Sequence, residues 1–352
     1  MTEKIDIKSA TMEEIKEILA GWEEKPFRAC QIFGWLHEKR VSSFEEMTNL
    51  SKALREKMAE ECSLTCMKEI DRLESVDGTK KFLFELYDGQ AIESVLMKYH
   101  HGNSVCISSQ VGCRMGCRFC ASTLGGLVRN LLSSEMLEQI YEIGRITGEN
   151  VSNVVVMGTG EPMDNYDNFI RFVRILSAKE GKNISVRNIT VSTCGIVENM
   201  KRLAEENLPL TLALSLHAPN DEIRKQMMPV AYKYKLEDVL AACDFYYEKT
   251  SRRITYEYSL VAGVNDSAEC AKELSERLKG KNCHVNLIPV NPIKERDFKK
   301  SRAEAIQNFK NILEKNRINV TIRREMGSDI NAACGQLRRS HTTKETCDRE
   351  EE

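Results

Sequence analysis

The chain has 352 residues, of which 41% are hydrophobic and 30% charged, with a formal net charge of −2. The composition is typical of a globular protein, and the length allows one large domain plus a small one, or two medium domains. The first residues lack the apolar core of a signal peptide, and no run approaches the roughly 18 apolar residues of a membrane span. The near-neutral charge neither indicates nor excludes a nucleic-acid partner, because binding needs only a local basic face.

The chain contains 13 cysteines. Because no secretory signal precedes them, they favour a reducing compartment in which thiols bind metals or react, and not a disulfide framework. We therefore expect a cytoplasmic protein without a membrane partner.

Residues 1–79 are expected to form a small N-terminal helical domain. Thr11 can cap a helix whose apolar residues Ile15, Ile18 and Leu19 recur at helical spacing. At Lys80 the pattern changes to two strand-like runs, 81–87 and 91–99, which are joined by Asp-Gly. This pattern predicts a β-hairpin linker over residues 80–101.

Residues 102–340 are expected to form an α/β domain. Six apolar strand-like runs alternate with helical stretches, which predicts parallel strands with crossover helices. The pattern leaves open a partial (β/α)6 barrel or a doubly wound sheet. In both architectures chemistry takes place at the carboxyl ends of the strands. Residues 341–352 are expected to be a charged, disordered tail.

Three cysteines, Cys113, Cys117 and Cys120, lie in one short loop after the first of these strands. A structural zinc site needs a fourth ligand, and the available candidate pair, Cys62 and Cys66, lies in the helical domain. Three thiolates on a [4Fe–4S] cluster leave one iron open for a substrate or cofactor. The C-x₃-C-x₂-C spacing is similar to the signature of radical S-adenosylmethionine (SAM) enzymes, with zinc as the alternative.

Polar and glycine residues follow the other strands. Gly158-Thr159-Gly160-Glu161 follows the second strand, where glycines allow close approach of a ligand and Glu161 can accept a hydrogen bond from an ammonium group. Each motif alone is equally compatible with an ordinary turn, but together they predict a binding site. The polar residues after later strands are Ser192, Ser215, His217 and Asn291.

Of the ten cysteines outside the cluster motif, two stand out by their position, Cys106 and Cys334. Cys106 is in the first strand, where a buried small hydrophobic residue is an equally good interpretation. Cys334 lies in the small-residue loop Asn331-Ala332-Ala333-Cys334-Gly335, where an exposed thiol can act as a nucleophile or be incidental.

Five motifs in order, CISSQVGCRMGCRFC, GTGEP, SLHAPND, NLIPVNP and DINAACGQL, resemble the RlmN/Cfr family of radical SAM RNA methyltransferases, with the RlmN branch nearer. The resemblance implies methylation of carbon 2 of adenosine in 23S rRNA, at the peptidyl transferase centre, and in tRNA next to the anticodon. It implies one [4Fe–4S] cluster, two SAM molecules per turnover, an electron donor such as flavodoxin or ferredoxin, and a monomer. It also implies RNA binding by the N-terminal domain.

The resemblance also implies roles for individual residues. Cys113, Cys117 and Cys120 match the cluster ligands, and Cys334 matches the cysteine that is methylated first. Cys106 matches the cysteine that resolves the protein–RNA adduct through a transient disulfide. Glu93 matches a proton acceptor, although its pattern alone indicates a solvated strand residue. The positions that match SAM-binding residues are Gly160, Glu161, Ser192, Ser215, Leu216, His217 and Asn291.

Two alternatives remain open. Carbon-8 methylation of the same rRNA adenosine shares every catalytic motif, and a zinc-stabilised RNA-binding protein without catalysis would need no SAM. Several basic residues are candidates for RNA contact but are individually more typical of solvated surface: Lys98, Arg129, Arg323, Arg324, Arg338, Arg339 and the 294–302 stretch.

Overall fold

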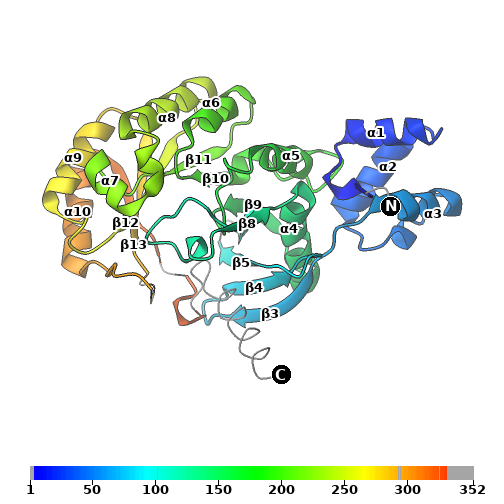
Figure 1. The fold of residues 1–352 in the computed structure, drawn as a ribbon, viewed down its shortest axis with the longest axis horizontal. Coiled ribbons are helices and arrows are strands. Elements are labelled where there is room, and N and C mark those ends of the chain that lie inside the picture. Colours follow the sequence, from blue (N-terminus) through cyan, green and yellow to red (C-terminus); the bar gives the residue numbers. More distant parts are fainter. Residues whose placement is uncertain (1–3, 101, 292, 294, 325, 331–352) are drawn as a thin grey trace.

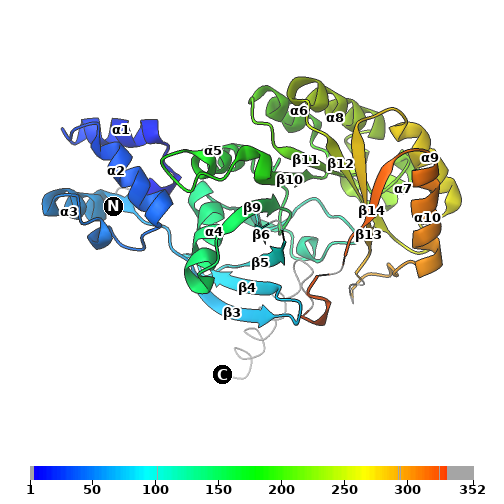
Figure 2. The same ribbon diagram turned by 180° about the vertical axis from the view of Figure 1, so that it is seen from behind.

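The computed structural model describes residues 4–330 except residues 101, 292, 294 and 325. A curved ten-stranded sheet is surrounded by helices, and a group of short helices lies at one end of the molecule (Figure 1; Figure 2). Within this described part of the chain, no helix is long and apolar enough to cross a membrane.

The larger part of the sheet is parallel. Its spatial order follows the order along the chain without reversal, whereas a doubly wound sheet reverses at a switch point. The sheet is therefore a partial barrel, and a doubly wound sheet is excluded. Its parallel strands are β6 (Gly102–Cys106), β9 (Val151–Val156), β10 (Ile189–Thr193), β11 (Thr211–Ser215), β12 (Ile254–Leu260), β13 (Cys283–Pro289) and β14 (Asn319–Ile322).

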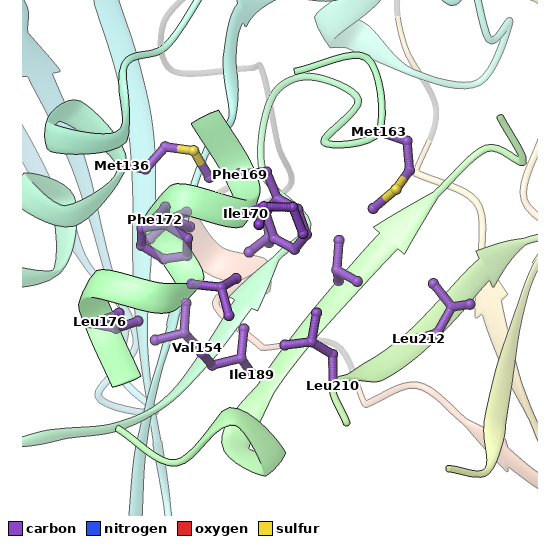
Figure 3. Packing of buried hydrophobic residues seen from close by; sticks show 14 of the residues in the cluster. Met136, Val154, Met163, Phe169, Ile170, Phe172, Leu176, Ile189, Leu210 and Leu212 are labelled. Carbon is purple, nitrogen blue, oxygen red and sulfur yellow. The ribbon is translucent and has the colours of Figure 1, made fainter. Parts of the chain in front are cut away.

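Helices connect these strands, as the alternating sequence pattern predicts. Figure 3 shows Phe169, Ile170 and Phe172 of one helix, α5, packed near Val154 of β9 and Ile189 of β10, all of them buried. The helices are α4 (Ser133–Thr147), α5 (Tyr166–Ser177), α6 (Val197–Glu205), α7 (Asp221–Met227), α8 (Leu236–Thr250), α9 (Ala268–Leu278) and α10 (Ala303–Lys315).

Three antiparallel strands extend the sheet beyond β6. The predicted hairpin is present as β4 (Lys80–Glu85) and β5 (Ala91–Tyr99), and β5 pairs with β6. The third strand, β3 (Lys68–Glu74), lies in a segment expected to be helical, so that expectation is wrong. Its charged sequence also suits a solvated helix, but pairing with β4 makes it an edge strand, where charged side chains are common. The sheet thus begins before residue 80, and the division into domains stays a prediction.

The N-terminal helices are α1 (Met12–Gly21), α2 (Arg28–Gly34) and α3 (Lys52–Glu61), and strands β1 (Ile5–Asp6) and β2 (Cys62–Ser63) pair in parallel. Thr11 caps α1 as predicted: its side chain accepts a hydrogen bond from the N–H of Glu14, whose carboxylate accepts from the N–H of Thr11.

A buried ion pair joins this helical group to the barrel. The Lys8 ammonium lies 2.7 Å from the Glu138 carboxylate on α4, and both side chains have no solvent exposure. Lys8 also donates to the carbonyl of Thr65 at 2.5 Å, and Arg145 forms a second ion pair with Glu138. These contacts connect the chain before α1 and the chain after α3 to one helix of the barrel.

We predict that Lys8→Met lowers the free energy of unfolding by about 3 kcal/mol, because the buried Glu138 carboxylate loses one of its two counter-charges and the Thr65 carbonyl loses its donor. Urea unfolding monitored by circular dichroism measures the change. Lys52→Met is the matched control, since its ion pair with Glu56 is exposed and is expected to change stability by less than about 1 kcal/mol. Equal effects of the two substitutions would contradict the prediction.

Candidate active site

A cavity of about 500 Å³ lies at the carboxyl ends of the parallel strands. Residues that follow β9, β10, β11 and β13 line it, as do side chains of β5 and β6 and residues 323–324 and 326–327. Its volume is within the range of sites that bind small molecules and cofactors.

The three cysteines of the motif lie in a loop whose base is closed by two short strands. Strands β7 (Gln110–Gly112) and β8 (Leu127–Asn130) form an antiparallel pair. Next to this pair, the N–H of Cys113 donates to the carbonyl of Gly126 at 2.8 Å. Gly112 has φ +80°, and a Cβ there would lie 2.0 Å from the carbonyl oxygen of Gly126. A glycine is therefore required where the loop begins.

All three thiols line the cavity, and Cys117 and Cys120 belong to or pack against a small hydrophobic cluster there. Burial raises the pKa of Cys113 to about 12; it also raises the pKa of Cys117, and the neighbouring Cys120 adds to that effect. Thiolates in this environment require compensating positive charge, which iron supplies. The motif supplies three thiols and no fourth ligand. It therefore fits a [4Fe–4S] cluster, whose fourth iron stays open, better than a structural zinc site, which needs four protein ligands.

The GTGEP segment follows β9 and packs directly against the cysteine loop. Gly160 has φ +109°, and a Cβ there would lie 2.6 Å from Cβ of Gln110. The buried Glu161 carboxylate accepts hydrogen bonds from the N–H groups of Cys194, at 2.7 Å, and Met163, at 3.0 Å. Burial raises the pKa of Glu161, and the Cys194 N–H opposes that rise. Glu161 therefore lines the cavity with its orientation fixed by two backbone groups.

The predicted polar residues after β10, β11 and β13 meet at the cavity. The hydroxyls of Ser192 and Ser215 lie 3.3 Å apart, and Asn291 lies on the same lining. Leu216 differs, because its side chain is in the hydrophobic core and its N–H donates to the carbonyl of Glu257.

His217 is held in one neutral tautomer. Burial lowers its pKa to about 3, with a smaller contribution from Arg224. Its Nδ1 accepts a hydrogen bond from the N–H of Ser259 at 2.9 Å, so the ring proton is on Nε2. The ring contacts Phe119 of the cysteine loop edge-on, with centroids 4.6 Å apart. This contact links the end of β11 to the cysteine loop.

Cys106 lines the same cavity from β6. It pairs in register with Val95 of β5, which in turn pairs with Lys81 of β4, so these three residues form a row on one face of the sheet. Glu93 lies two residues from Val95 and shares that face. It is 4% exposed and lies 3.0 Å from the buried Lys81 ammonium, so its interpretation as a solvated strand residue is wrong.

Cys334 lies outside the described residues, as do Arg338 and Arg339.

The sequence-based predictions missed two buried charged residues at or beside the site: Lys81 and Glu257. Glu257 lines the cavity and accepts from Asn286 at 2.9 Å, and burial raises its pKa. A carboxylate inside the apolar run ITYEYSLV is the sequence signal that points to it.

Both the N-terminal helical region and the barrel of this chain match families of known proteins. Residues 5–64 match the ribosomal RNA large subunit methyltransferase N-terminal domain, and residues 107–274 match the radical SAM superfamily. A probable dual-specificity RNA methyltransferase RlmN from Lachnoclostridium phytofermentans is 71% identical, covering 98% of this chain and 97% of its own length. The chain belongs to the RlmN family of radical SAM RNA methyltransferases.

Two further proteins support membership of the RlmN family. A probable RlmN from Lachnospira eligens is 63% identical over 96% of each chain. The crystal structure of a radical SAM methyltransferase from Sphaerobacter thermophilus superposes with a TM-score of 0.89 at 43% identity, covering 94% of this chain and 98% of the other. The protein is thus an RNA methyltransferase that uses SAM and a [4Fe–4S] cluster, as predicted.

We predict that the Cys117→Ala variant of this protein shows no visible iron–sulfur absorbance after anaerobic reconstitution with iron and sulfide, because the cluster loses one of its three protein ligands. Cys194→Ala is the matched control: Cys194 is buried in the same hydrophobic cluster as Cys117 but lies outside the motif. It is expected to retain the absorbance and the iron content. Retention of the full cluster in Cys117→Ala would show that Cys117 is not a ligand.

Proposed function

We propose that the protein methylates carbon 2 of an adenosine in 23S rRNA, at the peptidyl transferase centre, and of the adenosine next to the anticodon in tRNA. The observation that supports this most directly is the position of Cys106: a cysteine outside the cluster motif lines the same cavity as the three motif cysteines. Relatives named as dual-specificity RNA methyltransferases agree with two RNA substrates.

In this proposal Cys113, Cys117 and Cys120 hold the cluster. Gly160, Glu161, Ser192, Ser215, His217 and Asn291 bind SAM, with Leu216 contributing through its backbone. Bound there, the cluster and SAM would supply radical chemistry, and the proposal takes two SAM molecules per turnover. Cys334 carries the methyl carbon to the base as a thioether, because carbon 2 of adenine is too poor a nucleophile to attack an ordinary methyl sulfonium.

The protein–RNA adduct is then resolved by Cys106. Its thiolate attacks the sulfur of Cys334, so an S–S bond forms as the S–C bond breaks. The electron pair of the broken bond stays with the methyl carbon, which takes up a proton. Glu93 accepts the proton that carbon 2 loses once the methyl carbon is bonded to it. Its side chain lies 3.0 Å from the Lys81 ammonium and on the same sheet face as Cys106.

Charged residues around the cavity are consistent with an RNA substrate. Arg323 and Arg324 line the cavity, where they can neutralise phosphates next to an unstacked base. Lys98 is instead paired with Glu149, and Arg129 with Asp88 and Glu135.

The proposal includes three further parts. The N-terminal domain binds RNA, flavodoxin or ferredoxin supplies the electron, and the enzyme is a monomer.

Mass spectrometry of rRNA and tRNA nucleosides, from cells with and without the gene, tests the substrate. We expect 2-methyladenosine in both RNAs to depend on the gene. Accumulation of 8-methyladenosine without 2-methyladenosine would instead show carbon-8 specificity and refute the proposal.

We predict that Cys106→Ala forms a covalent protein–RNA adduct that survives denaturation, because no second thiolate is available to release the methyl carbon. Denaturing gel electrophoresis with labelled RNA detects it. Cys243→Ala, which removes a buried thiol from the hydrophobic core, is expected to turn over without accumulating an adduct. Normal turnover of Cys106→Ala would exclude the resolving role.

A further inference from the structure

A fully buried arginine lies close to the cysteine loop. Arg224, on α7, has no solvent exposure and is among the largest fully buried side chains. Its Nη2 donates to the carbonyl of Cys194 at 2.7 Å, and its Nη1 donates to the carbonyl of Tyr234 at 3.4 Å. Within the described part of the chain, its Nε–H has no hydrogen-bond partner. Backbone carbonyls are therefore the groups that hold this guanidinium.

The charge of Arg224 forms no ion pair with a carboxylate among the described residues. Burial lowers the pKa of Arg224, but a guanidinium stays protonated in proteins. Asp221, three residues earlier on α7, instead accepts a hydrogen bond from the N–H of Leu236 at 2.8 Å. Buried charges are normally paired or bound to a metal, so this one requires a negative partner.

The helix that bears Arg224 is attached to the cysteine loop. The N–H of Arg118, the residue after Cys117, donates to the carbonyl of Met227 at the end of α7, at 2.9 Å. Cys117, Met227 and Cys194 also belong to one hydrophobic cluster. The position of Arg224 is thus fixed relative to Cys117.

The backbone of Cys194 connects Arg224 to the cavity. Its carbonyl accepts from Arg224, and its N–H donates to the buried Glu161 carboxylate at 2.7 Å. A Cβ at Gly195, which has φ +102°, would lie 3.3 Å from Nη2 of Arg224. The guanidinium therefore packs closely against the segment that follows β10 and lines the cavity.

The charge of Arg224 acts on three residues that line the cavity. Burial raises the pKa values of Cys117 and Cys194 and lowers that of His217, and the Arg224 charge lowers all three. Such interactions are strong because buried groups are less screened than groups in water. The guanidinium therefore favours negative charge on the Cys117 sulfur.

We propose that Arg224 is the counter-charge of the iron–sulfur cluster and favours its one-electron reduction. The inference rests on Cys117 as a cluster ligand in the proposed function. Three thiolates give the ligated cluster a net negative charge, and the electron from flavodoxin or ferredoxin adds to it. A buried positive charge stabilises the reduced state more than the oxidised state, so it raises the reduction potential. Because it acts through Cys117 and the Cys194 backbone, Arg224 is a positioning residue.

The experiment measures the reduction potential of the anaerobically reconstituted holoenzyme without RNA. Dithionite is added in the presence of mediator dyes, and electron paramagnetic resonance quantifies the reduced cluster. For Arg224→Gln, we expect the ratio of reduced to oxidised cluster at the wild-type midpoint potential to fall at least tenfold. For a one-electron couple this equals a midpoint at least about 59 mV lower. Arg224→Lys keeps the positive charge and is expected to stay within threefold of the wild-type ratio.

Arg277→Gln is the matched control, because Arg277 on α9 is partly exposed and pairs with Glu273. It removes an equal charge where water and salt screen it, so the ratio should not change. Iron content, sulfide content and the urea midpoint are measured for every variant. A purely structural role of Arg224 would lower them in Arg224→Gln and Arg224→Lys alike.

Two results would overturn the proposal directly. One is a wild-type potential in Arg224→Gln, and the other is an equally low potential in Arg224→Lys, because the charge would then not be the cause. If Arg224→Gln folds but holds no cluster while Arg224→Lys holds one, the charge is needed to retain the cluster, which supports the counter-charge role. If neither variant holds a cluster, the role of Arg224 is structural and the proposal is wrong.

These outcomes are separate from those that test the proposed function. A complete cluster in Cys117→Ala would refute the ligand assignment on which this inference rests. Carbon-8 methylation of the RNA would refute the proposed function, but it would leave the potentials of the Arg224 variants as the test of this inference.

Discussion

The meeting of parallel strand ends at one edge of the sheet determines where chemistry can occur in this protein. Parallel strands with right-handed crossovers place every carboxyl end on the same side. Residues as distant in sequence as Glu161, Ser215 and Asn291 therefore line one cavity. The cysteine loop becomes part of that cavity because β7 and β8 fold it back beside the end of β6.

Local patterns were sufficient to predict much of the site. The cysteine spacing, the glycines after β9 and the polar residues after later strands are short-range signals, and the cavity brings them together. The partial barrel also follows from the alternation of strands and helices, although the absence of a reversal in strand order could be established only from the structure. Leu216 shows the limit of such patterns, because its side chain lies in the core.

Residues that depend on pairing between strands could not be predicted in the same way. Glu93 looks solvated in its own strand, but the register of β4 with β5 brings it next to Lys81 inside the sheet. Strand β3 is a similar case, since its charged sequence does not distinguish an edge strand from an exposed helix. In both cases the deciding contact comes from another segment of the chain, so the pattern of polar and apolar residues within the strand itself does not reveal it.

The sequential strand order also has a consequence for synthesis of the chain. Strands β3 to β6 are consecutive and joined by short connections, so they can pair before the remaining strands leave the ribosome. Each later strand, from β9 to β14, then adds to the edge formed by the strand before it. No strand has to insert between two that are already paired. The barrel can therefore grow in one direction during translation, and the cavity-lining residues after β14, such as Arg323 and Gly327, are synthesised only after every strand that borders the cavity.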